Sequence, residues 1–195
     1  MSLPLPIQTA RLEIRRFVNE DLADYLAYQT APEVLEFMPN GPMSESEAVE
    51  FIGQQAGLAE GEKGHYHAFA VFHPEDGKVI GDVGFYLHAG AENGGDMGFQ
   101  IHPAYHGKGY ASEAAAAVLR YGFVQLGLAR ITSGCDARNT SSFRLLERLG
   151  MRREGHLVQS RTTKGAVHDE FLYAMLREEF LRADGGVNND GHPIA

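Results

Sequence analysis

The chain has 195 residues, 44% hydrophobic and 22% charged, which is the composition of an ordinary globular domain. Its 17 Lys and Arg against 26 Asp and Glu give a formal net charge of −9. This disfavours general binding to nucleic acid or to anionic membranes, because both need a basic face. The single cysteine, Cys135, excludes an internal disulfide, and no run of about 18 apolar residues predicts a membrane span. We expect a cytoplasmic protein with one domain over residues 1–183 and a flexible tail over 184–195.

The first half of the chain predicts one strand, two helices and then three strands. Alternation of apolar and charged residues over Arg11–Arg15 indicates a short strand, and Asn19–Asp21 is typical of a helix start. Ser44 and Glu47 have the spacing of a capping box, which predicts a second helix through Ala56. Runs over 68–72, 79–87 and 97–101, separated by polar turns, predict consecutive antiparallel strands.

In the second half, helices alternate with strands. A glycine-rich turn at 106–109 opens a long helix from about Ala111 to Leu126. A strand over 130–135, a helix over 139–149 and strands near 153–161 and 168–176 follow. The order β-α-α-β-β-β-α-β-α-β-β predicts an α/β (α+β) fold. Its mixed, mostly antiparallel sheet would have about seven strands and be flanked by four helices.

The segment Met97–Ala114 runs from a strand through the glycine-rich turn into a helix. Glycines allow a tight turn and, with the helix N-terminus, direct several N–H groups toward one centre, which suits a pyrophosphate. Lys108 adds charge at the rim. Neither a P-loop nor a dinucleotide fingerprint fits, because Gly109 follows Lys108 and Ser112 takes the last glycine position. On the glycines alone, a plain helix-capping turn is an equal alternative.

Other residues around the turn narrow this interpretation. A His-Pro pair ends the strand, His106-x-x-Gly109-x-Ala111 follows, and Asn139–Met151 forms a later helix. All three resemble features of the GNAT superfamily of acetyl-CoA-dependent N-acetyltransferases. The last two are similar to its Gln/Arg-x-x-Gly-x-Gly/Ala and Asn-x-x-Ser/Ala…Glu-Lys-Leu-Gly-Phe motifs, with His106 replacing the usual Gln or Arg. The likeness covers about residues 7–180. Three more motifs look like the branch that includes ribosomal-protein N-terminal alanine acetyltransferases: Thr9-x-Arg11-Leu12-x-Ile14-Arg15, Glu154-Gly155 and Asp169-x-x-x-Tyr173-x-x-Leu176.

The resemblance implies a GNAT-like domain that uses acetyl-CoA as co-substrate and transfers acetyl directly to a primary amine, without an acyl-enzyme. The pyrophosphate would lie on the amides of the glycine turn. The pantetheine would run beside the strand at 97–101, where it separates from the strand at 130–135, and Ile101 would supply an N–H to the oxyanion. The residues implied in cofactor binding are Phe99, Ile101, His102, His106, Gly107, Lys108, Gly109, Tyr110, Ala111, Ser112, Asn139 and Phe143.

The residues that act as acid and base in the transfer are less clearly indicated by the sequence than those that bind the cofactor. The amine must lose a proton before it attacks, and the leaving thiolate takes one. Many relatives place a Tyr seven residues after the helix Asn, but this position is Leu146 here. Ser142 is the best substitute, unless it only satisfies the first N–H groups of its helix. Asp96 and Glu154 are the candidate bases; a solvated surface carboxylate or a water-relayed base is the alternative.

The acceptor side is expected in the early part of the chain, at the Met38–Met43 loop and the helix after Ser44, with Glu33 and Glu36 drawing in a cationic amine unless they are plain surface acids. The acceptor would be a protein N-terminus or a small-molecule amine, and the protein a monomer or homodimer without direct nucleic-acid or membrane partners. A non-catalytic acyl-CoA-binding module and a nucleotide-phosphate binder are the alternatives. No metal site is expected, since His65 and His67 lack a third ligand.

Overall fold

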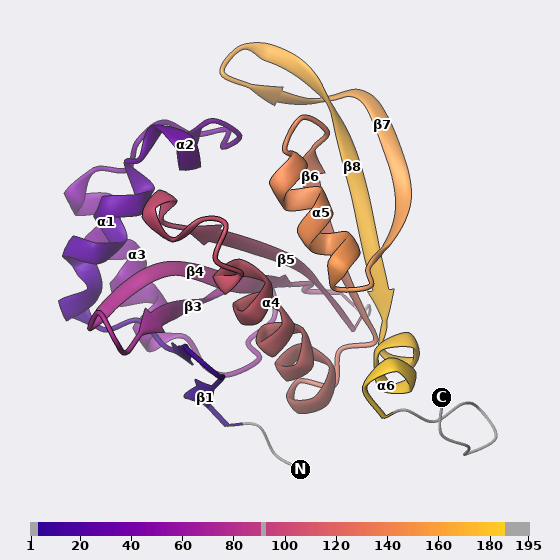
Figure 1. Cartoon of the computed structure of the whole chain (residues 1–195), viewed down its shortest axis with the longest axis horizontal. Helices are drawn as coiled ribbons and strands as arrows, with labels where there is room; N and C mark the ends of the chain where they lie inside the picture. The colour runs from indigo at the N-terminus through magenta and orange to yellow at the C-terminus, as the bar shows by residue number, and fades with distance from the viewer. Residues whose placement is uncertain (1–3, 91–92, 186–195) are drawn as a thin grey trace.

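The computed structural model describes residues 4–90 and 93–185 and arranges them around one eight-stranded sheet (Figure 1). The order of strands in the sheet is β1-β2-β3-β4-β5-β6-β8-β7. Neighbours are antiparallel except β5 and β6, which are parallel. This confirms the predicted class. The strands are β1 (Ile7–Gln8), β2 (Glu13–Arg15), β3 (Tyr66–His73), β4 (Lys78–Leu87), β5 (Gly94–Ile101), β6 (Arg130–Asp136), β7 (Arg152–Thr163) and β8 (Ala166–Leu176).

The predicted counts were slightly too low. The eighth strand is β1, two residues long and paired with β2. The described residues hold six α-helices rather than four, because α2 and α6 are additional. Helix α6 reaches Gly185, so the predicted tail begins in a helix, and residues 186–195 lie outside the described part. The helices are α1 (Leu22–Gln29), α2 (Pro32–Leu35), α3 (Glu45–Gly57), α4 (Tyr110–Arg120), α5 (Thr140–Arg148) and α6 (Arg177–Gly185).

Two predicted helices show how local sequence sets, or fails to set, the ends of elements. The capping box of α3 is confirmed: Ser44 N–H donates to Glu47 at 2.8 Å, and Ser44 Oγ accepts from Glu47 N–H. The single helix expected over 111–126 is wrong, since α4 ends at Arg120 and a π-helical turn follows over Tyr121–Gln125. Apolar periodicity does not distinguish one wider turn from a continued α-helix.

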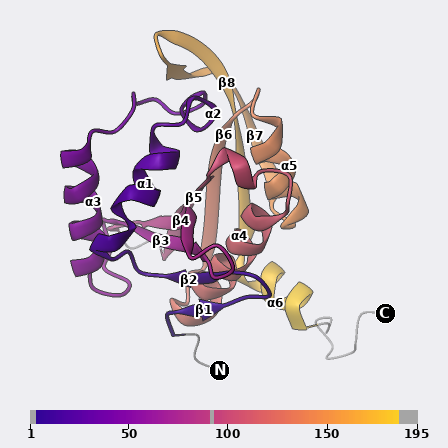
Figure 2. The ribbon, with the colours of Figure 1, turned by 60° about the vertical axis from the view of Figure 1, so that its left-hand side comes forward.

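The sheet separates two layers of helices, and the alternation of β3 explains why (Figure 2). Ala68 and Ala70 of β3 pack with Tyr25 of α1 and Ile52 of α3, whereas Phe69 and Val71 belong to the larger core beneath α4 and α5. Because successive side chains of a strand point to opposite faces, both faces of β3 are buried. Helices α1 and α3 therefore cover one face of the sheet, and α4 and α5 cover the other.

A carboxyl group is buried between the sheet and α1. Asp82 of β4 is 3% exposed, and its Oδ2 accepts a hydrogen bond from the Tyr28 hydroxyl at 2.9 Å. Burial raises the pKa of Asp82 to about 7, against a smaller opposing effect of the Tyr28 hydrogen bond. A carboxyl whose pKa is higher in the folded state stabilises the fold while it is protonated. That contribution is lost as pH rises from about 4 to about 7.

Replacing Asp82 by Asn should therefore stabilise the protein more at about pH 8 than at about pH 5. The amide still accepts from Tyr28 but carries no charge. We expect the gain in the unfolding midpoint to be roughly 3 °C or more larger at the higher pH, measured by thermal unfolding. The exposed Glu75→Gln serves as control and should show no such difference. An equal gain at both pH values would contradict burial of a charge at Asp82.

Candidate active site

The site forms where β5 and β6 stop pairing. Their parallel partners are confined to Gly94–Asp96 and Arg130–Thr132. Just beyond, Ser133 Oγ donates to the carbonyl oxygen of Met97 at 2.9 Å. The expected separation of these strands is confirmed, and it lies at the carboxyl ends of both.

The separation leaves backbone groups of β5 facing a gap. His102 N–H donates to the carbonyl oxygen of Ile80 at 2.7 Å, across the edge of β5 that pairs with β4. Backbone groups alternate in direction along an antiparallel strand, so Phe99 and Ile101 direct their N–H groups to the opposite edge. That edge is the one that β6 has left. Two ladder donors of β5 are thereby presented to whatever fills the gap.

A cavity of about 730 Å³ opens at this gap. It is bounded by β5, by the glycine turn with the start of α4, by α5, and by residues 33–38, which we call the α2 segment. Ser142, the predicted acid, lines it, and so do Glu33, Glu36 and Met38 of the predicted acceptor side. Nine of the twelve residues implied in cofactor binding line it as well: Phe99, Ile101, His106, Gly107, Gly109, Tyr110, Ala111, Ser112 and Asn139.

The glycine turn presents free N–H groups to the cavity. Gly107 and Gly109 have left-handed φ angles of 72° and 84°, which other residues adopt only with strain. Gly109 precedes α4 in the capping position, and no side chain caps the helix. The first N–H groups of α4 therefore lack intrahelical partners. With the positive end of the helix dipole they make an anion site of the kind that pyrophosphate fits.

Arg11 holds this turn from outside. Its guanidinium donates to the carbonyl oxygen of Lys108 at 3.0 Å and pairs with Glu113 of α4 at 2.7 Å. It also lies over the ring of Tyr110, 4.4 Å from its centroid. These contacts orient the turn and the first turn of α4 together. Sequence reasoning assigned Arg11 no role, although the residue belongs to one of the motifs that carried the resemblance.

His106 braces the same turn from the inside. Its Nε2 lies 2.7 Å from the carbonyl oxygen of Ile101, an acceptor, so the ring nitrogen donates. The end of β5 and the turn are thereby linked by a side chain where relatives commonly carry Gln or Arg. Three of the residues predicted to bind cofactor lie away from the cavity lining: His102, Lys108 and Phe143.

Each of these three side chains has a local partner instead. His102 Nδ1 accepts from Ala104 N–H at 3.1 Å. The Lys108 ammonium lies 5.2 Å from the centroid of the Tyr105 ring. Phe143 packs edge-to-face on Phe171, with 5.6 Å between centroids. Short-range capping, cation–π attraction and aromatic packing therefore account for their positions.

The first turn of α5 brings two predicted residues to the cavity. Asn139 caps the helix, its Oδ1 accepting from Ser142 N–H at 3.0 Å. Cys135, on β6, is a buried strand thiol that is 6% exposed. Burial raises the pKa of Cys135 to about 11, against a smaller opposing effect of a hydrogen bond with Ser142. A thiol in this state is a poor nucleophile near neutral pH.

The cavity has a cationic end and an acidic end. Arg144 and Arg148, four residues apart on α5, both line it, and Arg148 donates to Ser112 Oγ at 3.3 Å. Asn139 lies nine residues before Arg148, roughly 14 Å along the helix. Near that other end, Arg138 lies 5.8 Å from the ring of Phe37 in the α2 segment, which also carries the two glutamates. Sequence reasoning missed both cavity arginines, because they occupy the polar side of an amphipathic helix.

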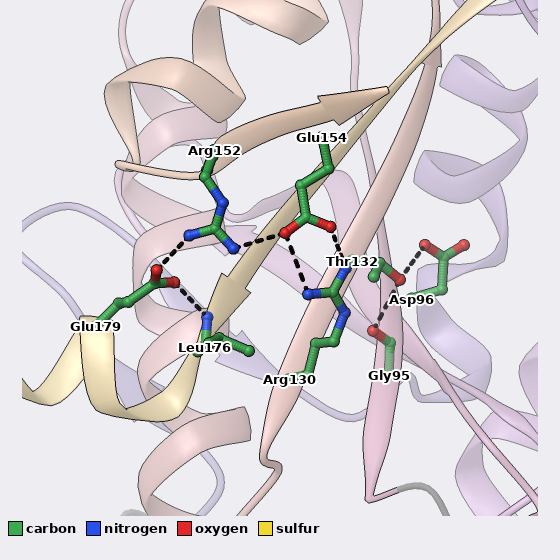
Figure 3. Close-up of polar contacts among 8 residues, drawn as sticks. All are labelled: Gly95, Asp96, Arg130, Thr132, Arg152, Glu154, Leu176 and Glu179. Atoms are coloured by element: carbon green, nitrogen blue, oxygen red, sulfur yellow. Dashed lines mark hydrogen bonds and ion pairs between the residues drawn. The ribbon is translucent and has the colours of Figure 1, made fainter. Parts of the chain in front are cut away.

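The two candidate bases do not line the cavity. Figure 3 shows that each is held by neighbouring side chains instead. Asp96 is exposed on β5 and accepts from Thr132 Oγ1 at 3.0 Å. Glu154 forms ion pairs with Arg130 and Arg152. The guanidinium of Arg130, followed by that of Arg152, lowers the pKa of Glu154 to about 2. A carboxylate that binds its proton so weakly is a weak base, so the geometry supports a structural role for Glu154.

Two features are absent from residues 4–90 and 93–185, the part of the chain that the structure describes. In that part of the chain, no group of three or more His, Cys, Asp and Glu side chains is arranged to hold a metal ion. His67, one of the histidines considered, instead lies 2.6 Å from the carbonyl oxygen of Glu62 through its Nε2. None of the helices in the same residues is long and apolar enough to span a bilayer.

Comparison with known proteins identifies the class and then the family. The fold is that of an acetyltransferase. The family model for the acetyltransferase (GNAT) domain matches residues 11–152, and the chain belongs to this family. It is 36% identical over 174 residues to the uncharacterized N-acetyltransferase YnaD of Bacillus subtilis (strain 168), which covers 89% of this chain and 98% of YnaD.

Solved structures agree with this assignment. A GNAT-family acetyltransferase from Bacillus anthracis superimposes with a TM-score of 0.77 at 33% identity, covering 88% of this chain and 98% of that one. A ribosomal-protein-S5-alanine acetyltransferase from Vibrio fischeri superimposes with a TM-score of 0.80 at 19% identity, covering 90% and 98%. The second likeness concerns the fold.

The anion site at the glycine turn predicts a selective effect of substituting Gly109. Gly109→Val forces a β-branched side chain into a left-handed φ and misdirects the N–H groups that follow. We expect acetyl-CoA affinity, measured by calorimetry, to fall at least about tenfold.

Gly127→Val is the matched control, since Gly127 also has positive φ (65°) but does not line the cavity. It should destabilise the fold comparably and leave acetyl-CoA affinity unchanged. Unchanged affinity in folded Gly109→Val would contradict the anion site.

Proposed function

We propose that this protein transfers the acetyl group of acetyl-CoA directly to a primary amine. The observation that carries the proposal is the cavity: its cationic end holds the free amides of α4, its acidic end holds the α2 segment, and the β5–β6 separation lies between them. Acetyl-CoA supplies an acetyl group activated as a thioester. The two ends suit a polyanionic co-substrate on one side and a cationic acceptor on the other.

The residues present fit acetyl-CoA. The amides from Gly109 to Ser112 would hold the pyrophosphate, with Arg144 and Arg148 close enough to compensate further phosphate charge. Phe99 and Ile101 offer strand-like N–H groups to the pantetheine amides and to the thioester oxygen. Asn139 commits its Oδ1 to the helix cap, which leaves its Nδ2 to donate to the pantetheine.

The transfer itself requires two proton movements. The lone pair of the amine nitrogen forms a bond to the acetyl carbon, and the carbon–sulfur bond breaks with its electron pair on sulfur. One N–H proton leaves the nitrogen, and one proton ends on the sulfur. Ser142, on the cavity wall at the first turn of α5, is our proposed hydrogen-bond donor to the sulfur.

Neither of the two candidate bases, Asp96 and Glu154, is in place for direct proton transfer. Asp96 precedes Phe99, the nearest β5 residue on the cavity wall, by three positions, roughly 10 Å along the strand. Direct proton transfer requires hydrogen-bond distance or one intervening water. We therefore propose that the amine loses its proton through a water relay, and that Glu154 takes no part.

The acceptor approaches from the α2 segment. Glu33 and Glu36 are exposed and line the cavity, and Val34, Phe37 and Met38 supply apolar surface between them. Of the Met38–Met43 loop, Met38 lines the cavity, whereas Met43 packs into the core beneath α1 and α3. We propose a cationic amine with an apolar stem as acceptor; a protein N-terminus and a small metabolite both fit this description.

A second candidate is a non-catalytic acyl-CoA-binding module. The observation that favours it is Leu146, which occupies the position of the missing Tyr and is completely buried. Thiol release from acetyl-CoA in the presence of a panel of amines distinguishes the two. We expect amine-dependent release of free CoA with a matching acetylated product. Tight binding of acetyl-CoA without release from any amine would support the module.

The role of Ser142 is tested by removing its hydroxyl. Ser142→Ala should lower turnover by roughly ten- to a thousand-fold, the range of a positioned proton donor or somewhat below it, while acetyl-CoA affinity changes little. Ser141→Ala is the matched control, because Ser141 lines the same cavity one residue earlier. It should keep turnover within about threefold of wild type. Full turnover in Ser142→Ala would leave protonation of the sulfur to solvent.

The acidic end of the cavity predicts charge-dependent selectivity. The double substitution Glu33→Gln/Glu36→Gln should lower kcat/KM for a dicationic amine about five- to fiftyfold at low salt, and less at high salt because exposed charges are screened. A neutral amine substrate should be little affected. Glu45→Gln/Glu50→Gln removes the same charge from α3, outside the cavity lining, and is the control. Equal losses for both acceptors would contradict the assignment.

A further inference from the structure

Two arginines of α5 face the cavity and have no carboxylate partner among the described residues. Arg144 and Arg148 both line the cavity and are exposed, and residues four apart on a helix are neighbours on its surface. Glu147 lies between them in sequence but instead accepts from Arg153 at 2.7 Å and from the Tyr173 hydroxyl at 2.9 Å. Two positive charges are therefore left for a ligand at this end of the cavity, in a chain whose formal net charge is −9.

One of these arginines reaches the anion site at the start of α4. Helices α4 and α5 lie side by side on one face of the sheet (Figures 1 and 2), and Arg148 Nη2 donates to Ser112 Oγ at 3.3 Å. The backbone bonds of α4 begin with Glu113 N–H, which donates to the carbonyl oxygen of Gly109 at 3.0 Å. The N–H groups of residues 110–112 therefore have no partner within the helix. Arg148 lies beside the last of these free amides.

The amides alone do not match the charge of CoA. Besides its pyrophosphate, CoA carries a 3′-phosphate on the adjoining ribose, and a phosphate monoester has a charge of about −1.5 to −2 near pH 7. A helix N-terminus supplies the equivalent of roughly half a positive charge. The free amides of α4 are already assigned to the pyrophosphate. The 3′-phosphate therefore needs a further cation on the cavity wall, or it stays in water.

Two other cations close to the glycine turn are engaged within the chain. Arg11 pairs with Glu113 at 2.7 Å, behind the turn. The Lys108 ammonium lies over the ring of Tyr105 and does not line the cavity. The two arginines of α5 are thus the cationic side chains of the described cavity lining that keep donors open to a phosphate.

We propose that Arg144 and Arg148 together bind the 3′-phosphate of CoA, and that this contact makes the protein select CoA over 3′-dephospho-CoA. The identity of the ligand rests on the proposed acetyl transfer. A guanidinium presents a planar fork of N–H donors that matches two phosphate oxygens. The hydrogen bond from Arg148 to Ser112 is long, so Arg148 loses little when it turns to a phosphate.

The test measures the binding of CoA and of 3′-dephospho-CoA to the full chain by calorimetry. Wild type should bind CoA about 10–100-fold more tightly, the range of hydrogen bonds to a charged group, and less selectively at high salt. In Arg144→Gln/Arg148→Gln, CoA affinity should fall by about the same factor. Affinity for 3′-dephospho-CoA should change by less than about threefold, so that the preference disappears. The rise of the unfolding midpoint at a fixed ligand concentration should follow the same order.

Two further variants separate charge from geometry. Arg148→Lys keeps the charge but not the fork, and should retain part of the preference. Arg177→Gln/Arg182→Gln removes the same charge from exposed positions of α6, outside the cavity lining, and is the matched control. It should leave both affinities unchanged. Unfolding midpoints of all the ligand-free variants should stay within about 2 °C of wild type, because the substituted side chains are exposed.

The outcomes separate this inference from the proposed function. Equal affinities of wild type for the two ligands would overturn the inference and leave the transfer standing. Equal losses for both ligands in the double variant would assign the arginines to the pyrophosphate, and a lost preference in the α6 control would assign it to net charge; either result overturns the inference. A preference that depends on the two arginines, in a protein that releases no thiol with any amine, would support it and refute the transfer. Binding of neither ligand would overturn both.

Discussion

The short parallel pairing of β5 and β6 is the constraint on which the rest of the structure depends. Parallel neighbours need a long crossover connection, and here the glycine turn, α4 and the π-helical turn provide it. Helix α4 follows β5 and α5 follows β6, so both begin at the carboxyl ends of the two strands. Because pairing stops after three residues, both helix N-termini and the unpaired edge of β5 meet at one gap. Open sheets that contain parallel strands commonly bind ligands at such carboxyl ends.

Charged and polar groups around the site fall into two sets: pairs outside the cavity that hold its walls in place, and groups on the cavity wall that can bind a ligand. Outside the cavity, opposite charges are paired: Arg11 with Glu113 behind the glycine turn, and Arg153 with Glu147 where α5 meets β7. Exposed pairs of this kind contribute little to stability on their own, but they orient the segments that they join. On the cavity wall, the first N–H groups of α4 have no side-chain cap. The wall is thus arranged for groups that arrive from outside.

Local patterns in the sequence predicted the elements, because alternation, helical periodicity, the Ser44–Glu47 box and the glycines act over a few residues. The short helix α2 and the two-residue strand β1 were not predicted, because so few residues show no periodicity. The cofactor side of the site followed from contiguous motifs, and the structure places most of their residues on the cavity. The bases did not follow: besides the neighbouring Arg152, Glu154 pairs with Arg130, 24 residues away, and nothing local to either residue predicts this second ion pair.

Because Leu146 is buried, the thiolate that leaves in the proposed transfer must be stabilised by groups other than an acid at this position. Leu145 and Leu146 anchor α5 in the core, so a polar acid at 146 would have to displace apolar packing. The first turn of the same helix offers another solution. A helix N-terminus carries roughly half a positive charge and lowers the energy of an anion placed before it. Sulfur leaving beside Ser142 would be stabilised by that dipole and by the hydroxyl together, so a strong acid is not required at the moment of bond cleavage. In this chain, the same N-terminal turn that Asn139 caps would then serve both the pantetheine and the departing thiol.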